Sequence, residues 1–130
     1  MITVTNKLRN IFGFSILLFI AHGVEEFLTH FYETDAWDQA IFGNLFGNLS
    51  TQVMLWLLLT ISFLLLLGEN WQFRILAIAG LIYIYELHHI IKAVSEWGYY
   101  PGLITSLAFP VVAILFWKEW FRVYKNYKNN

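Results

Sequence analysis

The sequence predicts an all-α fold, a four-helix transmembrane bundle in which residues 1–130 form a single transmembrane domain. The chain is 58% hydrophobic and only 13% charged, and its mean hydropathy lies above zero. A soluble domain of this size would bury only about two thirds of its surface, so large apolar patches would face water. Four apolar stretches, each near the ~20 residues that a membrane-crossing helix needs, are expected as the spans. They cover approximately residues 11–31, 50–67, 75–96 and 102–117.

The first two spans are separated by a segment that favours turns. Glycine and asparagine residues lie at positions 43, 44, 47 and 48, where they would interrupt a helix. The apolar part of the second span is short, and the polar residues 50–52 just before it are expected to supply the missing length at ~1.5 Å per residue.

The third and fourth spans are bounded by similar signals. Residues 68–70, Gly-Glu-Asn, separate the second span from the third, and residues 98–102 separate the third from the fourth. Pro101 suits the first turn of a helix, and Trp117 extends the fourth span at its end. Pro110 falls inside that span, where it predicts a kink and one missing backbone hydrogen bond.

The distribution of basic residues predicts the orientation. Seven of the Lys and Arg residues fall on one side of the predicted membrane, Lys92 approaches the other side, and the connection at residues 31–51 has none. Because Lys and Arg accumulate in cytoplasmic loops, both termini are expected to be cytoplasmic in a multi-pass protein of the cell membrane. The basic residues expected on the cytoplasmic side are Lys7, Arg9, Arg74, Lys118, Arg122, Lys125 and Lys128.

The first apolar stretch also resembles a signal peptide. Two basic residues precede an apolar run that reaches Ala21, and Gly23 lies where cleavage would occur. The apolar pattern resumes at Phe27, Leu28 and Phe31, however, which makes the stretch long enough to span a membrane. We therefore interpret it as the first transmembrane helix.

Ionisable side chains are concentrated in the first span. His22, Glu25, Glu26 and His30 lie within nine residues, although a central acidic residue costs ~2.5–3.5 kcal/mol in a membrane. On a helix of ~100° per residue these four side chains fit one arc of ~140°. The opposite side of the helix is apolar, so the polar arc is expected to face partners inside the bundle.

The third span contains the expected partners. Glu86 and His89 are separated by three residues and share one face of a helix, whereas His88 points about 160° away from His89. Glu86 lies twelve residues beyond Arg74, as His22 lies twelve beyond Asn10. Both polar groups are therefore expected at one depth, but the sequence alone does not decide between His88 and His89.

Carboxylates and imidazoles that converge in a helical bundle suit first-row metals. The predicted ligands of one or two divalent ions, zinc, iron or manganese, are His22, Glu25, Glu26, His30, Glu86 and His89. We expect Glu25 or Glu26, when it is not bound to metal, to act as a catalytic base on a lipid or another apolar small molecule. Thr105 and the amides at the start of the fourth span would orient a substrate anion.

Two other functions fit the same residues. The His and Glu side chains could relay protons or cations through a channel or carrier, or form a structural hydrogen-bond network without catalysis. The enzyme hypothesis corresponds to a metal-dependent membrane hydrolase or oxidoreductase. The net charge of −1 argues against a nucleic-acid partner, membrane lipids are expected partners, and a homo-oligomer stays open.

The motif His22-Gly-Val-Glu25-Glu26 resembles the defining motif of the HXXEE family of small integral membrane proteins. The later Tyr100-Pro101-Gly102-Leu-Ile-Thr105 is similar to a second marker of that family, and His88 or His89 is similar to its third-helix histidine. The resemblance extends from the first span into the fourth. It implies an integral membrane protein of unassigned function, and it points to Pro101, Gly102 and Thr105 as further site residues.

Overall fold

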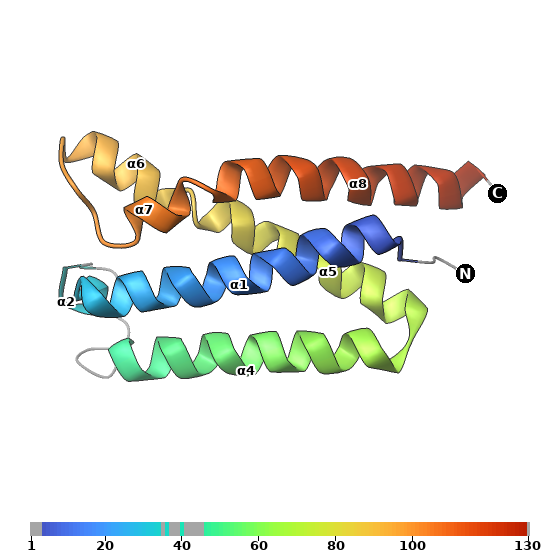
Figure 1. Ribbon diagram of the computed structural model, residues 1–130, viewed down its shortest axis with the longest axis horizontal. Coiled ribbons are helices and arrows are strands. Elements are labelled where there is room, and N and C mark those ends of the chain that lie inside the picture. Colours follow the sequence, from blue (N-terminus) through green and yellow to red (C-terminus); the bar gives the residue numbers. More distant parts are fainter. Residues whose placement is uncertain (1–3, 35, 37–39, 41–45, 130) are drawn as a thin grey trace.

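The computed structural model describes residues 4–34, 36, 40 and 46–129, and its secondary structure there is helical (Figure 1). In the predicted connection at residues 31–51, residues 35, 37–39 and 41–45 lie outside the described part. Gly47 and Asn48 were expected to interrupt a helix but lie in the first turn of α4, which corrects that prediction. Two helices are long and uninterrupted, and the other two spans each consist of two helices. The helices are α1 (Asn6–Leu28), α2 (Phe31–Thr34), α4 (Phe46–Leu67), α5 (Glu69–Tyr85), α6 (His88–Ser95), α7 (Leu103–Ser106) and α8 (Phe109–Asn129).

The segments form an up-and-down bundle in which both termini lie at the same end (Figure 1). Helix α1 contacts α8, α7 and α4, while α5 packs between α4 and α8. Helices α6 and α7 lie together at the opposite end of the bundle. This arrangement confirms the predicted all-α fold of four helical segments.

Three helical segments are long and apolar enough to cross a membrane: Asn6–Leu28, Trp71–Ser95 and Leu103–Asn129. The described apolar part of α4, Val53–Leu65, is shorter. Large apolar side chains such as Leu17, Ile78 and Ile114 are exposed on the outside of the bundle. In water this surface would be unfavourable, so it is the surface expected to face lipid.

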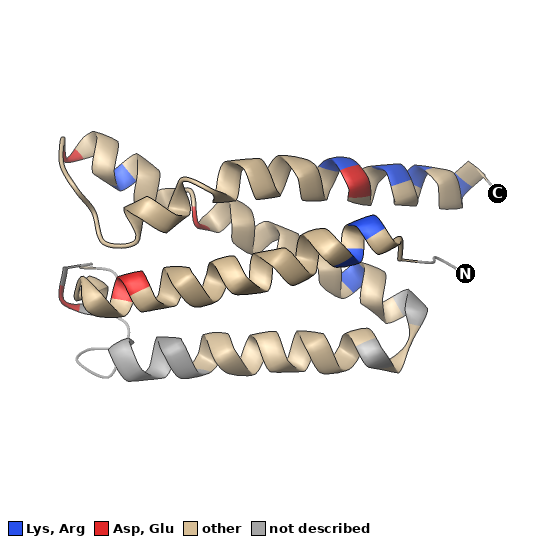
Figure 2. Cartoon of the chain, viewed as in Figure 1, with Lys and Arg blue, Asp and Glu red and all other residues tan. Residues whose placement is uncertain are grey.

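Basic residues gather at the end of the bundle where the termini lie, on the starts of α1 and α5 and along the end of α8 (Figure 2). Lys92, on α6 at the other end, is the exception that the sequence predicted. This distribution of basic residues is the one that predicts cytoplasmic termini. The orientation itself stays a prediction.

The core of the bundle is built from helix faces with regular spacing. The buried residues of α1 follow each other at three- and four-residue steps, as expected for one face of a helix. They pack against aromatic residues of α5 and α8, and Tyr83, Phe109 and Phe116 are fully buried. The buried residues of α1 are Leu8, Phe12, Ser15, Phe19 and His22.

Two interruptions distinguish the fold from four continuous helices. The third span is broken at Glu86 and Leu87, where the Leu87 N–H donates to the Ile84 carbonyl at 3.2 Å, in a tighter turn than that of an α-helix. The fourth span is broken at Leu107 and Ala108, two to three residues before Pro110. Because proline has no N–H to donate, the predicted kink appears as a short break.

The observed bounds also correct the predicted ones. Helix α1 starts five residues earlier than predicted and ends at Leu28, and α8 continues to Asn129, well beyond the predicted end at residue 117. At the start of α1, the Leu8 N–H donates to the Thr5 side chain, which caps the helix. The end of α8 is amphipathic and extends past its apolar segment, which hydropathy alone does not detect.

Candidate metal centre

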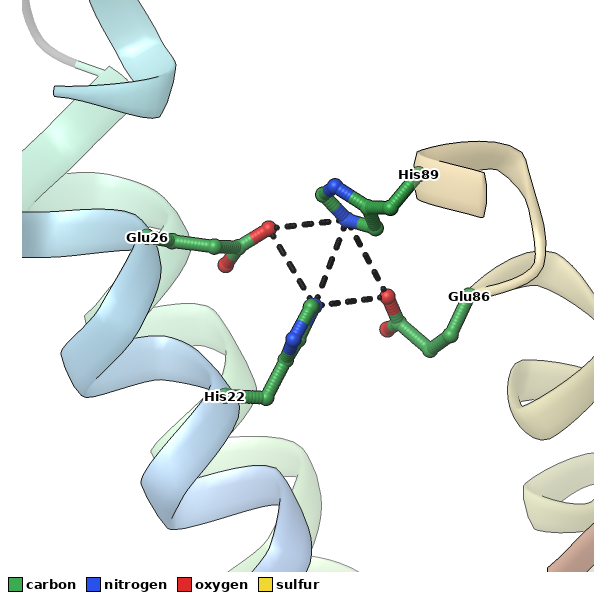
Figure 3. A group of neighbouring side chains, drawn as sticks. All are labelled: His22, Glu26, Glu86 and His89. Atoms are coloured by element: carbon green, nitrogen blue, oxygen red, sulfur yellow. Dashed lines mark hydrogen bonds and ion pairs between the residues drawn. The ribbon is translucent and has the colours of Figure 1, made fainter. Parts of the chain in front are cut away.

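Four ionisable side chains, three of them buried and one partly buried, meet where α1 passes the interruption of the third span (Figure 3). His22 and Glu26 come from α1, and they are separated by four residues and therefore share a helix face. Glu86 lies in the break after α5, and His89 lies in the first turn of α6. One nitrogen or oxygen atom from each side chain lies within 4.8 Å of the others, so the group could hold a metal ion.

Five of the distances within this group are close to those between the ligand atoms of a tetrahedral site. His22 Nε2 lies 2.9 Å from Glu86 Oε2 and 3.4 Å from Glu26 Oε1. His89 Nε2 lies 3.1 Å from Glu26 Oε1 and 3.4 Å from Glu86 Oε2, and the two Nε2 atoms are 3.2 Å apart. A tetrahedral zinc ion with ligand bonds of about 2.0–2.1 Å requires ligand atoms about 3.3–3.4 Å apart. The two carboxylate oxygens lie within 4.8 Å of each other, so the four side chains are close enough to surround one ion.

The outer nitrogen of His22 shows which tautomer the ring adopts. The Thr105 hydroxyl donates to Glu25 Oε2 at 2.5 Å, and a hydroxyl has only one proton to donate. The 2.7 Å contact between His22 Nδ1 and Thr105 Oγ1 must therefore have Nδ1–H as its donor. A neutral His22 ring then has its Nε2 lone pair directed into the group.

His89 has the same tautomer for a simpler reason. Its Nδ1 lies 2.6 Å from the Pro101 carbonyl oxygen, which can only accept a hydrogen bond. In the neutral rings, two Nε2 lone pairs therefore face each other at 3.2 Å, and each also faces carboxylate oxygens. Atoms that can only accept repel one another, so either a metal ion or at least one shared proton is needed between them.

The connection at residues 99–102 closes over the two rings. Gly102 adopts φ +82°, a left-handed conformation that glycine adopts without steric penalty. A Cβ atom at Gly102 would lie 2.8 Å from His22 Cε1 and 2.9 Å from His89 Cε1. The buried Tyr100 packs against His89, with ring centroids 5.8 Å apart. Glycine is therefore required here both for the turn and for the space that the rings occupy.

Glu25 does not belong to the four-residue group, which corrects its prediction as a metal ligand. Its carboxylate accepts from the Tyr99 hydroxyl at 2.8 Å, the Ile104 N–H at 2.9 Å, and the Thr105 N–H at 2.8 Å. With the Thr105 hydroxyl it has four donors, which is about the number a carboxylate can accept. Burial, and then the hydrogen bond to Glu25, raise the pKa of Tyr99, so its hydroxyl stays a donor at neutral pH.

This arrangement changes the predicted roles of the start of the fourth span. The amides of Ile104 and Thr105 were expected to orient a substrate anion, but Glu25 occupies them. Glu25 is for the same reason not available as a catalytic base in this structure. Thr105 instead links Glu25 to His22, and Pro101 orients His89. Thr105, Pro101 and Gly102 thus lie around the group, as the sequence resemblance suggested, and support its histidines.

The other two histidines are directed elsewhere. Helix α1 ends at Leu28, and His30 has φ +55°, so it does not continue the helical face that would have brought it to the group. It is exposed and lies 3.6 Å from Glu33. His88 Nδ1 lies 2.9 Å from the Tyr85 carbonyl oxygen, to which it donates. The structure therefore identifies His89 as the histidine of the third span that faces the group.

The side of the group nearer the termini is covered by aromatic rings. Phe109 packs edge-on against His22, with ring centroids 5.3 Å apart. Phe19 lies 4.9 Å from Phe109 and 5.6 Å from Tyr83, again between ring centroids. The Tyr83 hydroxyl pairs with Ser15 at 2.7 Å in the interior. An apolar aromatic layer therefore separates the group from the basic end of the bundle.

Two functional features were not recognised in the sequence. The first is the role of Tyr99, whose hydroxyl donates to Glu25. The second is the Glu25–Thr105–His22 connection, which depends on residues 80 or more positions apart. The sequence does contain one indication of this connection. Thr105, a residue with a hydroxyl group, follows Pro101-Gly102 in the first turn of the next helix.

Scans against protein-family models, curated proteins and solved structures found no match to this chain. Membership of the HXXEE family consequently stays a prediction, and it rests on the motif residues themselves.

Proposed function

We propose that the protein is a multi-pass membrane protein whose function depends on one divalent metal ion, bound by His22, Glu26, Glu86 and His89. The observation that carries this proposal is the pair of Nδ1–H groups. Each is fixed by an acceptor outside the group, so each neutral ring directs an Nε2 lone pair at the same small volume. Metal-binding histidines are typically oriented by such hydrogen bonds on the other ring nitrogen.

The ligand chemistry favours zinc, with iron and manganese as alternatives. Two carboxylates balance the charge of a divalent ion, and two neutral imidazoles complete four-coordination in an apolar interior. Zinc is favoured in particular because two imidazole nitrogens and two carboxylate oxygens are ligands it takes in four-coordinate sites. Because these atoms surround one volume, the arrangement supports one ion rather than the bridged pair that the sequence also allowed.

The proposal extends to catalysis on a lipid or another apolar small molecule. Among the four ligands, the Glu26 side chain is 17% exposed, whereas Glu86 is 7% exposed and both histidines are fully buried. Glu26 is therefore the ligand that a substrate or water can reach and displace. A metal ion at such a position activates bound water, and the displaced Glu26 carboxylate would lie close enough to accept its proton.

A proton or cation relay across the membrane is supported less well. A relay needs polar groups or water on both sides of the site. On one side Thr105 and Glu25 lead from His22 toward the exposed Tyr99. On the other side His22 packs against Phe109, and Phe19 and Tyr83 continue the aromatic layer behind that ring. A site entered from one side fits this asymmetry better.

Metal analysis of the purified protein tests the first part of the proposal. Wild type and the control His30→Ala should contain about one metal ion per chain by inductively coupled plasma mass spectrometry. His22→Ala and Glu86→Gln should each lose the metal ion. Each variant keeps only three of the four ligands and leaves a buried ionisable side chain without its partner. A wild-type protein that is purified without metal and takes up none of zinc, iron or manganese would refute the metal site.

The catalytic part has a separate test. Lipid extracts from cells that express wild type should differ in composition from extracts of cells that express the metal-free His22→Ala at equal levels. If metal is bound in wild type but the two lipid profiles are identical, and no added apolar substrate is consumed, the enzyme hypothesis is wrong and the metal site stands.

A further inference from the structure

A second candidate site lies at the basic end of the bundle, between α5 and α8. A cavity of about 620 Å³ opens there, away from the four-residue group. Its wall is mainly aromatic, and a single charged side chain, Arg74, lines it. The lining residues are Trp71, Phe73, Arg74, Ala77, Trp120, Tyr124 and Tyr127.

The aromatic wall of this cavity is rigid on one side. The rings of Phe73 and Trp120 stack at 4.4 Å and 12°, and those of Trp120 and Tyr124 stack at 5.4 Å and 11°. The Trp120 indole N–H also donates to the Phe73 carbonyl oxygen at 3.1 Å, which ties α8 to α5. Stacked amphipathic rings of this kind are typical of the interface between hydrocarbon and headgroups.

Arg74 gives the cavity a positive charge that no described carboxylate neutralises. Its guanidinium lies 5.9 Å from the centre of the Trp71 ring, and the side chain is exposed. Among the described residues, no carboxylate forms an ion pair with it. Further basic residues of α1 and α8 lie at the same end of the bundle (Figure 2). An anionic ligand is therefore the complementary partner.

The surface that continues from Arg74 is apolar and exposed. Along α5, Trp71, Arg74, Ile78 and Leu81 are spaced three to four residues apart, so they share one helix face. Ile78 is 61% exposed and Leu81 is 58% exposed. This face therefore presents an interfacial ring, then a cation, then about two turns of apolar surface toward the bilayer interior. A ligand with an anionic head and a hydrocarbon tail matches that order.

We propose that this cavity binds one anionic phospholipid, with its phosphate on Arg74 and an acyl chain along Ile78 and Leu81. Basic pockets between transmembrane helices are suited to such headgroups because the guanidinium can donate two parallel hydrogen bonds to a phosphate. The aromatic wall holds the headgroup and the glycerol at the interface. This site is independent of the metal centre and of its proposed chemistry.

Native mass spectrometry of the detergent-solubilised protein tests this site. The probes are phosphatidylglycerol and phosphatidylcholine with identical acyl chains, and inorganic phosphate serves as a competitor. Wild type should bind one phosphatidylglycerol at least about tenfold more tightly than phosphatidylcholine. Arg74→Gln should remove that preference. Arg74→Lys should keep part of it, because the positive charge stays but the bidentate hydrogen bonding to the phosphate is lost.

Arg9→Gln is the matched control, because it removes an exposed cation from the same end of the bundle but outside the cavity. Its effect should be about fivefold at most, the size expected for general attraction to an anionic surface. Equal losses in Arg74→Gln and Arg9→Gln would overturn the site in favour of such general attraction. Displacement of the lipid by millimolar inorganic phosphate would overturn it in favour of a phosphate site without a lipid role.

Discussion

Replacement of Gly102 by alanine is expected to disable the metal centre without removing any ligand. Two sources of strain combine at this position. A non-glycine residue at φ +82° costs ~1–3 kcal/mol, and an added methyl group in a packed site costs another ~1–3 kcal/mol. The new Cβ would lie 2.8 Å from His22 Cε1 and 2.9 Å from both His89 Cε1 and Nδ1.

The two rings have little freedom to relieve this strain. Ordinary contacts of a Cβ begin at 3.4 Å, so each ring would have to retreat by roughly half an ångström. His22 Nδ1 donates to Thr105 at 2.7 Å and His89 Nδ1 donates to Pro101 at 2.6 Å, so such a movement stretches or breaks both bonds. It also exceeds the ~0.2 Å tolerance of metal–ligand distances. If about 2 kcal/mol of the strain reaches the site, the Kd for metal rises roughly thirtyfold.

Zinc affinity measured by competition with a chromogenic chelator is the appropriate assay, because it does not depend on the reaction. Two glycine variants separate the local effect from general destabilisation. Gly13→Ala should be silent, since nothing lies within 4 Å of its added Cβ. Gly80→Ala places a Cβ 2.7 Å from the Phe116 ring and should lower thermal stability, but it should leave zinc affinity unchanged. Wild-type affinity in Gly102→Ala, or an equal loss in Gly80→Ala, would show that the reasoning is wrong.

Two further predictions concern hydrogen bonds between helices, one beside the metal centre and one at the opposite end of the bundle. Thr105→Val keeps the shape of the side chain but removes the hydroxyl between Glu25 and His22, so zinc affinity should fall about 10–100-fold, with Thr105→Ser near wild type in the same chelator competition. A result in which valine and serine behave alike would exclude the hydrogen-bonded support. Glu119→Gln weakens the buried contacts of Glu119 with Thr5 and Arg122, so denaturation should show a loss of ~1–2 kcal/mol with unchanged metal content. A loss of metal in Glu119→Gln would mean that the two ends of the bundle are coupled.

Most of the candidate site follows from helical periodicity and depth. His22 and Glu26 share a face of the first span, Glu86 and His89 share a face of the third, and equal distances from the basic flanks predict that they meet. All four side chains form the observed group. These predictions succeed because each depends on residues within one turn of helix, where the geometry is regular.

The predictions that were wrong concern residues at which the helices stop being regular. His30 was placed by continuing the first helix to residue 31, but the helix ends at Leu28 and His30 leaves its face. The Thr29 hydroxyl donates to the Glu25 carbonyl oxygen at 2.7 Å and so satisfies one of the last carbonyl groups of α1. No periodicity in the surrounding sequence marks this end.

The choice between Glu25 and Glu26 could not be made from the first helix either. Both lie on its polar arc, about 100° apart. What separates them is the position of α7, which brings the amides of Ile104 and Thr105 to Glu25. The position of α7 depends in turn on the left-handed turn at Gly102 and on the break before Pro110. Roles that are decided by contacts between residues 80 positions apart are not contained in a local pattern.

The irregular backbone between α6 and α7 has a physical function in this arrangement. Within a continuous helix a carbonyl in the middle of the chain already accepts from the N–H four residues later, whereas a carbonyl outside the helix is free of that bond. Pro101 lies before α7 begins, and among the described backbone hydrogen bonds none ends on its carbonyl, which accepts from His89 Nδ1 instead. Non-helical backbone is tolerated inside a membrane only where its polar groups find such partners. The His89 N–H and the Pro101 carbonyl therefore satisfy each other's hydrogen-bonding need. If the fourth span were a continuous helix at residue 101, His89 would lack the acceptor that directs its Nε2 toward His22.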